Sequence, residues 1–155
     1  MPPHSNENET DNAALSLKLM VVLSKAQKSV LDKASKDIRR YGMSPTEFGI
    51  LEVLYAKGRI PLQQIGDKML ITSGTMTYNI DKLAGKGLLK RVPCQEDRRV
   101  IYAELTEEGR ALLDRIFPQH AEAMHRLMSV LTPEQQQTAI DLLKILGKGV
   151  QEHDN

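Results

Sequence analysis

Residues 61–105 constrain the fold of this chain most strongly, because two short helical patterns are followed there by two strand patterns. In the second helical pattern, Ser73 to Gly87, apolar residues recur at helical spacing at Met76, Ile80, Leu83 and Ala84. The residues roughly opposite that stripe are Tyr78, Lys82, Gly74 and Gly85, and Thr75 and Thr77 lie at its edges. The predicted outer face is therefore small, hydroxylic and basic, and it can approach another surface closely.

A shorter helical pattern precedes this helix and runs from Pro61, at the first helical position, to Met69. Only residues 70–72 then separate it from Ser73, which we expect to cap the second helix. Two short helices joined by so short a turn form a helix-turn-helix, whose second helix enters the DNA major groove. Many short helix pairs bind nothing, so this pattern alone leaves a purely structural role open.

The segment after the second helix predicts a β-hairpin. Gly87 is placed to end the helix, Leu88 to Pro93 reads as a short strand, and Val100 to Leu105 alternates in polarity. The charged turn between the strands ends in Arg98 and Arg99. A hairpin at this position makes a winged helix-turn-helix, and adjacent arginines suit contact with phosphates or the minor groove. An ordinary solvated hairpin tip is the alternative.

These residues resemble the MarR (multiple-antibiotic-resistance regulator) family. The run Ile71 to Thr77, followed by Asp81-Lys82-Leu83 and Gly87-Leu88-Leu89, is similar to the recognition helix of that family. The segments Asp97-Arg98-Arg99 and Leu105 to Gly109 look like its D-x-R…L-T-x-x-G pattern. The match covers about residues 60–110, with Arg99 on the motif arginine and Asp97 on the aspartate that steadies it.

The resemblance implies a homodimeric, triangular, mostly helical DNA-binding regulator. It also implies regulation by a small aromatic or phenolic ligand, bound in the crevice between the dimerisation and DNA-binding parts. Tyr78 departs from the pattern, because many relatives carry a basic residue there. That difference puts the base preference of this chain in doubt.

We expect a fold that is mainly α with a small β-wing, in which N- and C-terminal dimerisation helices flank the winged helix-turn-helix. The predicted regions are a disordered arm (1–11), a dimerisation helix (12–41), the DNA-binding region (44–105), C-terminal dimerisation helices (106–149) and a frayed tail (150–155). Capping-box patterns start helices at Ser44 and Thr132, and Pro118 should kink or break the helix that begins after Thr106. The sequence indicates only weakly a third strand of the sheet at Arg59-Ile60.

Composition narrows the class of protein. The net charge is +1, but residues 59–99 hold eight Lys/Arg against four Asp/Glu, whereas residues 100–155 hold five against nine. Basic charge is therefore concentrated on the predicted DNA-binding stretch. No apolar run approaches the roughly 20 residues of a membrane span, and no signal-peptide pattern is present, so we expect a cytoplasmic protein without a membrane partner.

Other chemistry has little support in the sequence. The one cysteine, Cys94, excludes an intrachain disulfide and a Cys-rich metal site. His120 and His125 lie about 140° apart on a helix, so they suit packing or surface positions better than a metal site. No phosphate loop, nucleophile elbow or facing acid pair appears, so we expect no enzyme activity, no catalytic or metal site and no cofactor.

We therefore predict a dimeric, sequence-specific transcriptional regulator, a repressor released by a small ligand, that binds double-stranded DNA at a pseudo-palindromic operator. The predicted DNA contacts are Ser73, Thr75, Thr77, Tyr78, Lys82, Lys86, Lys90, Arg98 and Arg99, with Asp97 supporting the wing. Two alternatives stay open. One is redox sensing through Cys94, which lies close in sequence to Lys90, Arg91, Arg98 and Arg99. The other is a winged-helix protein-interaction module without DNA affinity.

Overall fold

The structure, a computed structural model, describes residues 5–69 and 71–153. Its elements are α1 (Ser5–Arg39), α2 (Pro45–Lys57), β1 (Ile60–Pro61), α3 (Leu62–Met69), α4 (Ser73–Gly85), β2 (Leu89–Pro93), β3 (Ile101–Leu105), α5 (Glu107–Met128) and α6 (Pro133–Glu152). The three strands form an antiparallel sheet in the order β1-β3-β2. The predicted fold class, mainly α with a small β-wing, is confirmed.

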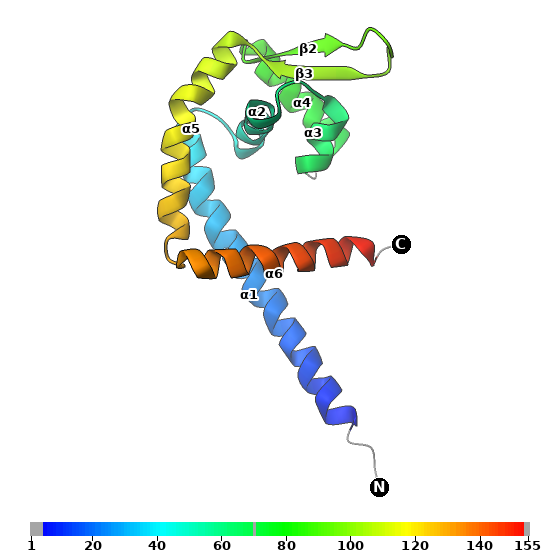
Figure 1. Cartoon of the computed structure of the whole chain (residues 1–155), viewed down its shortest axis with the longest axis vertical. Helices are drawn as coiled ribbons and strands as arrows, with labels where there is room; N and C mark the ends of the chain where they lie inside the picture. The colour runs from blue at the N-terminus through cyan, green and yellow to red at the C-terminus, as the bar shows by residue number, and fades with distance from the viewer. Residues whose placement is uncertain (1–4, 70, 154–155) are drawn as a thin grey trace.

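One hydrophobic core holds the predicted DNA-binding region together. Side chains from α2, α4 and the sheet meet in it, including the fully buried Phe48, Ile80 and Leu89. Leu113 of α5 is also fully buried there, so the first half of α5 belongs to this body. In Figure 1, α2, α3, α4 and the sheet lie together at one end, while α1 extends far away from them.

A buried polar contact connects the two long helices beside that core. His120 Nδ1 of α5 lies 3.0 Å from Asp37 Oδ2 of α1, and both residues are buried. The His120 ring also packs on Phe48 of α2, with 4.5 Å between ring centroids. His120 is thus a packing histidine, as predicted, and it fixes α1 and α5 against the DNA-binding body.

Local capping patterns are realised where the sequence predicts them. Ser44 with Glu47 and Thr132 with Gln135 both form complete capping boxes at the starts of α2 and α6. At the other end of α4, Gly87 has φ +76°, and the Leu88 N–H donates to the Leu83 carbonyl. Glycine is favoured at such a position, because its backbone adopts the left-handed conformation without a steric penalty.

Several predicted boundaries are wrong by a few residues. Residues 5–11 of the predicted arm are helical, because no proline or glycine follows before Gly42, and residues 1–4 lie outside the described part. Helix α6 likewise continues through residues 150–152, which were predicted to fray, while residues 154 and 155 lie outside the described part. Pro61 belongs to β1, whose pairing with β3 keeps it extended, and α3 begins at Leu62.

Pro118 does not break α5, so of the two predicted outcomes, a kink or a break, the break is wrong. The helix runs without a gap from Glu107 to Met128, and Figure 1 shows it as one curved ribbon. A proline in a helix removes one hydrogen bond and crowds the carbonyl four residues earlier. Burial of Ile116 and His120 on either side compensates here and keeps the helix continuous.

Two long helices expose apolar side chains. No residue of α6, all of which lies in the described part, is buried, and Ile145 is 70% exposed. The N-terminal half of α1 exposes Leu15, Leu17 and Met20 in the same way. Within the described residues, no helix is both long and apolar enough to span a membrane.

Candidate nucleic-acid interface

The exposed face of α4 is built from small and hydroxylic residues. Met76, Ile80 and Leu83 are buried in the core, so the opposite side of the helix faces outward. The predicted contact residues Ser73, Thr75, Thr77 and Tyr78 are all exposed, and Tyr78 is 66% exposed. These hydroxyl groups can donate to and accept from the edges of bases or phosphate oxygens.

The start of α4 is fixed by a short turn after α3. Thr72, and not the predicted Ser73, caps the helix, because its Oγ1 accepts from the Thr75 N–H at 3.2 Å. The Thr72 hydroxyl also donates to Thr75 Oγ1 at 3.0 Å. Capping by Thr72 leaves the Ser73 side chain exposed on the first turn of the helix, which is the end that enters the groove in helix-turn-helix proteins.

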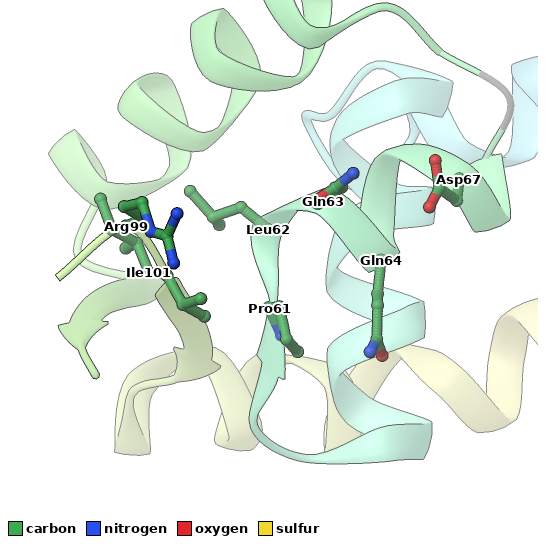
Figure 2. A pocket seen from close by; sticks show the side chains of 8 residues that line it. Pro61, Leu62, Gln63, Gln64, Asp67, Arg99 and Ile101 are labelled. Carbon is green, nitrogen blue, oxygen red and sulfur yellow. The ribbon is translucent and has the colours of Figure 1, made fainter. Parts of the chain in front are cut away.

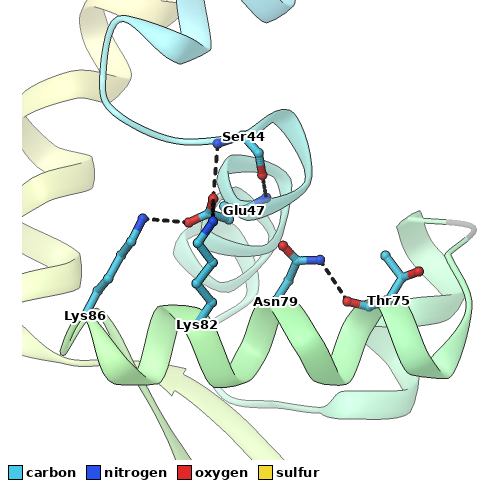
Figure 3. Close-up of polar contacts among 6 residues, drawn as sticks. All are labelled: Ser44, Glu47, Thr75, Asn79, Lys82 and Lys86. Atoms are coloured by element: carbon cyan, nitrogen blue, oxygen red, sulfur yellow. Dashed lines mark hydrogen bonds and ion pairs between the residues drawn. The ribbon is translucent and has the colours of Figure 1, made fainter.

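Lys82 and Lys86 point to a different partner from the one predicted. Figure 3 shows both side chains rising from α4 to the carboxylate of Glu47 on α2. Lys82 Nζ lies 3.2 Å from Glu47 Oε1, and Lys86 Nζ lies 2.8 Å from Glu47 Oε2. Lys82 is exposed at its helical position, but its flexible stem bends toward α2. Their predicted contact with DNA stays a prediction, and it requires both ammonium groups to leave Glu47.

Glu47 is buried and charged. Only 2% of its side chain is exposed, and its Oε1 also accepts from the Ser44 N–H at 3.3 Å. Burial alone would raise the pKa of Glu47, but hydrogen bonds from Lys86, the Ser44 N–H and Lys82 outweigh it and lower the pKa to about 2. The capping-box pattern identified Glu47 in the sequence, but nothing local indicated its two lysine partners.

The wing carries its arginines at an exposed tip. Asp97 Oδ1 accepts from the Arg99 backbone N–H at 3.0 Å and from Arg99 Nε at 3.2 Å. These bonds from the Arg99 backbone, and then from its guanidinium, lower the pKa of Asp97. Arg99 remains 91% exposed, and Arg98 forms no ion pair with any described residue. Both guanidinium groups are therefore available to an anionic partner.

The base of the wing is connected to the rest of the sheet and to α4. Glu104 on β3 pairs with Arg59 at 2.9 Å and with Lys90 of β2 at 3.3 Å. Lys90, a predicted DNA contact, therefore already has an ion-pair partner within the protein. Arg91 of β2 pairs with Asp81 of α4. The last pair, which the sequence did not reveal, orients the hairpin relative to the helix.

The L-T-x-x-G segment joins the wing to α5. The Thr106 hydroxyl donates to the Gly87 carbonyl at 2.6 Å and accepts from the Gly109 N–H at 3.0 Å. A Cβ atom at position 109 would overlap the Leu88 carbonyl oxygen. Glycine is required here by this close approach, which places the end of the wing against the end of α4.

Two hollows lie near these residues. One, of about 360 Å³, separates Arg99 and Ile101 of the wing from Leu62 and Asp67 of α3 (Figure 2). The other, of about 330 Å³, lies between the end of α1 and α5, where Arg40 and Arg115 line it.

Cys94 is half-buried at the wing, and its predicted redox role stays a prediction.

Comparison with known proteins agrees with this geometry. A sequence model of the MarR family matches residues 43–101. The chain is 47% identical over 140 residues to the HTH-type transcriptional regulator MhqR of Bacillus subtilis, covering 90% of this chain and 97% of that protein. It is 33% identical over 128 residues to the HTH-type transcriptional regulator PecS of Dickeya dadantii, covering 80% and 75%.

A solved structure has the same arrangement. The MarR family regulator Sco3205 of Streptomyces coelicolor, crystallised in complex with DNA, superposes with a TM-score of 0.81 at 26% identity over 89% of each chain. The interpretation of the winged helix as a protein-interaction module without DNA affinity is therefore wrong. This chain belongs to the MarR family, whose members are DNA-binding transcriptional regulators and not enzymes.

Proposed function

We propose that this regulator is a homodimeric repressor that binds a pseudo-palindromic operator and leaves it when a small ligand binds. The observation that carries the proposal is the exposed hydroxylic face of α4 beside a wing tip with two exposed arginines, Arg98 and the Asp97-bonded Arg99. A face without bulky aliphatic groups suits close approach to base edges, and exposed arginines suit phosphates and the minor groove.

In this proposal α4 lies in the major groove. Ser73, Thr75, Thr77 and Tyr78 face the bases, and Arg98 and Arg99 enter the flanking minor groove. Lys90 is placed to reach a phosphate from the base of the wing, because it is 59% exposed and one Glu104 carboxylate also neutralises Arg59. Sco3205, at 26% identity, was crystallised with DNA, which supports this orientation as a proposal for the present chain.

The dimer is supported by apolar surface that one chain leaves uncovered. Apolar side chains of α1 and α6 that stand half or more exposed include Leu15, Leu17, Leu142, Leu143 and Ile145. So many exposed apolar side chains on two helices indicate an interaction surface. A two-fold dimer would also supply the two recognition helices, about 34 Å apart, that a palindromic site requires.

Release by a ligand and repression complete the proposal. The hollow between α1 and α5 is polar and basic, with Arg40, Tyr41 and Arg115 around it, which suits a small aromatic ligand carrying an acidic hydroxyl or carboxyl group. A dimer bound over a promoter would exclude the polymerase. Because the proposed partner is the chromosome, the predicted cytoplasmic location remains part of this proposal.

A binding titration tests the proposal. The protein is titrated against DNA from immediately upstream of its own gene and against a scrambled duplex, at two salt concentrations. Tighter binding to the upstream DNA, falling steeply as salt rises, is the expected result. Equal weak binding to both duplexes would reject that operator. Phenols and aromatic carboxylates that release the upstream DNA but not the scrambled one would support ligand control.

A further inference from the structure

One buried carboxylate, that of Glu47, holds the two lysines of the α4 segment. Lys82 and Lys86 are one helical turn apart, and each donates to a different oxygen of Glu47. Glu47 is 2% exposed, so its carboxylate cannot follow the lysines outward. The Ser44 N–H bonds to the same carboxylate and holds it at the start of α2.

Free lysines beside a recognition helix would change what the protein binds. Phosphates are the same in every sequence, so each ammonium that contacts one adds affinity for all DNA and none for the operator alone. Lys82 and Lys86 belong to the segment that carries the proposed reading face and are 46% and 39% exposed, so their long stems would let a released ammonium reach toward DNA. Pairing with a buried carboxylate opposes the transfer of these lysines to phosphates, because the transfer would leave the Glu47 charge uncompensated in the core.

We propose that Glu47 is a specificity-determining residue: it withholds Lys82 and Lys86 from the DNA backbone and fixes α4 on α2, so that the exposed hydroxyl face makes the contacts that depend on sequence. This inference rests on the proposed placement of α4 in the major groove. It differs from the sequence-based prediction, in which both lysines contact DNA.

The experiment compares the salt dependence of binding among matched variants on a random-sequence duplex. Glu47→Gln removes the charge but keeps the capping bond, because glutamine serves at this position of a capping box. Glu52→Gln is the matched control: Glu52 is exposed on the same helix, and it forms no ion pair with any described residue. Thermal unfolding of each variant shows that the binding measurements are made on folded protein.

Glu47→Gln should bind the random duplex more tightly and steepen the slope of log affinity against log salt concentration by about 2, since it releases two ammonium groups and each can neutralise one phosphate. Affinity should then fall about 10-fold more than that of the wild type between about 50 and 200 mM salt. Adding Lys82→Gln to Glu47→Gln should remove about half of that change, and adding Lys82→Gln and Lys86→Gln together should restore the wild-type slope. In the native background Lys82→Gln alone should leave the slope unchanged, as should Glu52→Gln.

Two results would overturn the inference. A salt slope flattened by about 1 in Lys82→Gln or Lys86→Gln alone would mean that these lysines contact phosphates in the native protein. Weaker binding of Glu47→Gln to the random and the upstream duplex in equal proportion, with no change of slope, would mean that Glu47 is merely structural.

The same series separates this inference from the proposed function. If the wild type shows no preference for the upstream DNA, the proposed operator fails. The slopes on random DNA still decide the role of Glu47, because they need no operator. If the wild type does prefer the upstream duplex, the ratio of the two affinities should fall in Glu47→Gln and recover when Lys82→Gln and Lys86→Gln are both added.

Discussion

Replacement of Glu47 by glutamine gives the sharpest test of how α4 is held in place. The native carboxylate is buried and bonded to two ammonium groups at 3.2 and 2.8 Å. Glutamine has almost the same volume and retains the bond to the Ser44 N–H. The variant therefore removes a charge without removing a cap or leaving a cavity.

The size of the effect follows from the pKa. A carboxyl whose pKa falls from 4.5 to about 2 on folding contributes about 3 kcal/mol of stability at neutral pH. Both lysines are partly exposed, and water screens their charges, so we expect a loss nearer about 2 kcal/mol in Glu47→Gln. For a chain of this size that loss lowers the midpoint of thermal unfolding by about 4–8 °C.

The pH dependence identifies the origin of the loss. Because the pKa in the folded state is depressed, the contribution of Glu47 is complete above about pH 4.5 and disappears as pH falls toward 2. The difference between wild type and Glu47→Gln should therefore shrink to less than half its neutral value near pH 3. A loss that came from packing would not depend on pH.

Thermal unfolding at pH 7 and near pH 3, at one fixed protein concentration, measures both quantities. The concentration must be fixed because dimerisation would make the midpoint depend on it. Glu52→Gln removes an exposed carboxylate that pairs with no described residue, so it should change the midpoint little at either pH. An equal destabilisation by Glu47→Gln at both pH values would refute the electrostatic reasoning, as would a neutral-pH effect below about 0.5 kcal/mol.

Further predictions concern the wing, the junction with α5 and the apolar helices. Arg99→Ala should weaken binding to every duplex and flatten the salt slope by about 1 in titrations; unchanged affinity would show that the wing tip does not contact DNA. Gly109→Ala should cost about 3 kcal/mol in denaturant unfolding, because its Cβ overlaps the Leu88 carbonyl. Gly85→Ala, whose Cβ meets no described atom within 4 Å, should instead gain up to about 1 kcal/mol. Ile145→Glu, at a position 70% exposed, should convert a dimer to monomers by light scattering, and an unchanged mass would remove α6 from the interface.

Local patterns in the sequence predicted the elements well. The capping boxes at Ser44 and Thr132 involve residues three apart, so the chain brings their groups together whatever the rest of the fold does. The alternating strands after Gly87 likewise predicted the hairpin, and the D-x-R pattern placed Asp97 within two residues of Arg99. Interactions of this kind require no knowledge of tertiary structure.

Boundaries were less predictable, because tertiary and helix-wide energies override single residues. Pro118 was expected to interrupt α5, yet burial of its neighbours keeps that helix whole. Pro61 looked like a helix start, but pairing of β1 with β3 draws it into the sheet. In each case the sequence signal was genuine and a contact with a distant segment outweighed it.

The contacts of Lys82 and Lys86 show where a helical projection stops being informative. The projection of α4 placed Lys82 outward, and its position is indeed exposed. It could not show that α2 presents a buried carboxylate, that of Glu47, 39 residues before Lys86 and within reach of both lysine stems. The net positive charge of residues 59–99 was therefore an incomplete guide to DNA contacts, because Glu47 neutralises part of that charge inside the protein.

That internal pairing divides the proposed DNA interface into two parts with different chemistry. With both lysines on Glu47, the α4 segment presents mainly hydroxyl groups, and the exposed guanidinium groups are at the wing tip. Affinity for phosphate and readout of bases are then assigned to separate elements. Substitutions in the wing should alter salt dependence, substitutions on the face of α4 should alter preference among sequences, and Glu47→Gln should mix the two by adding a backbone contact to the reading helix.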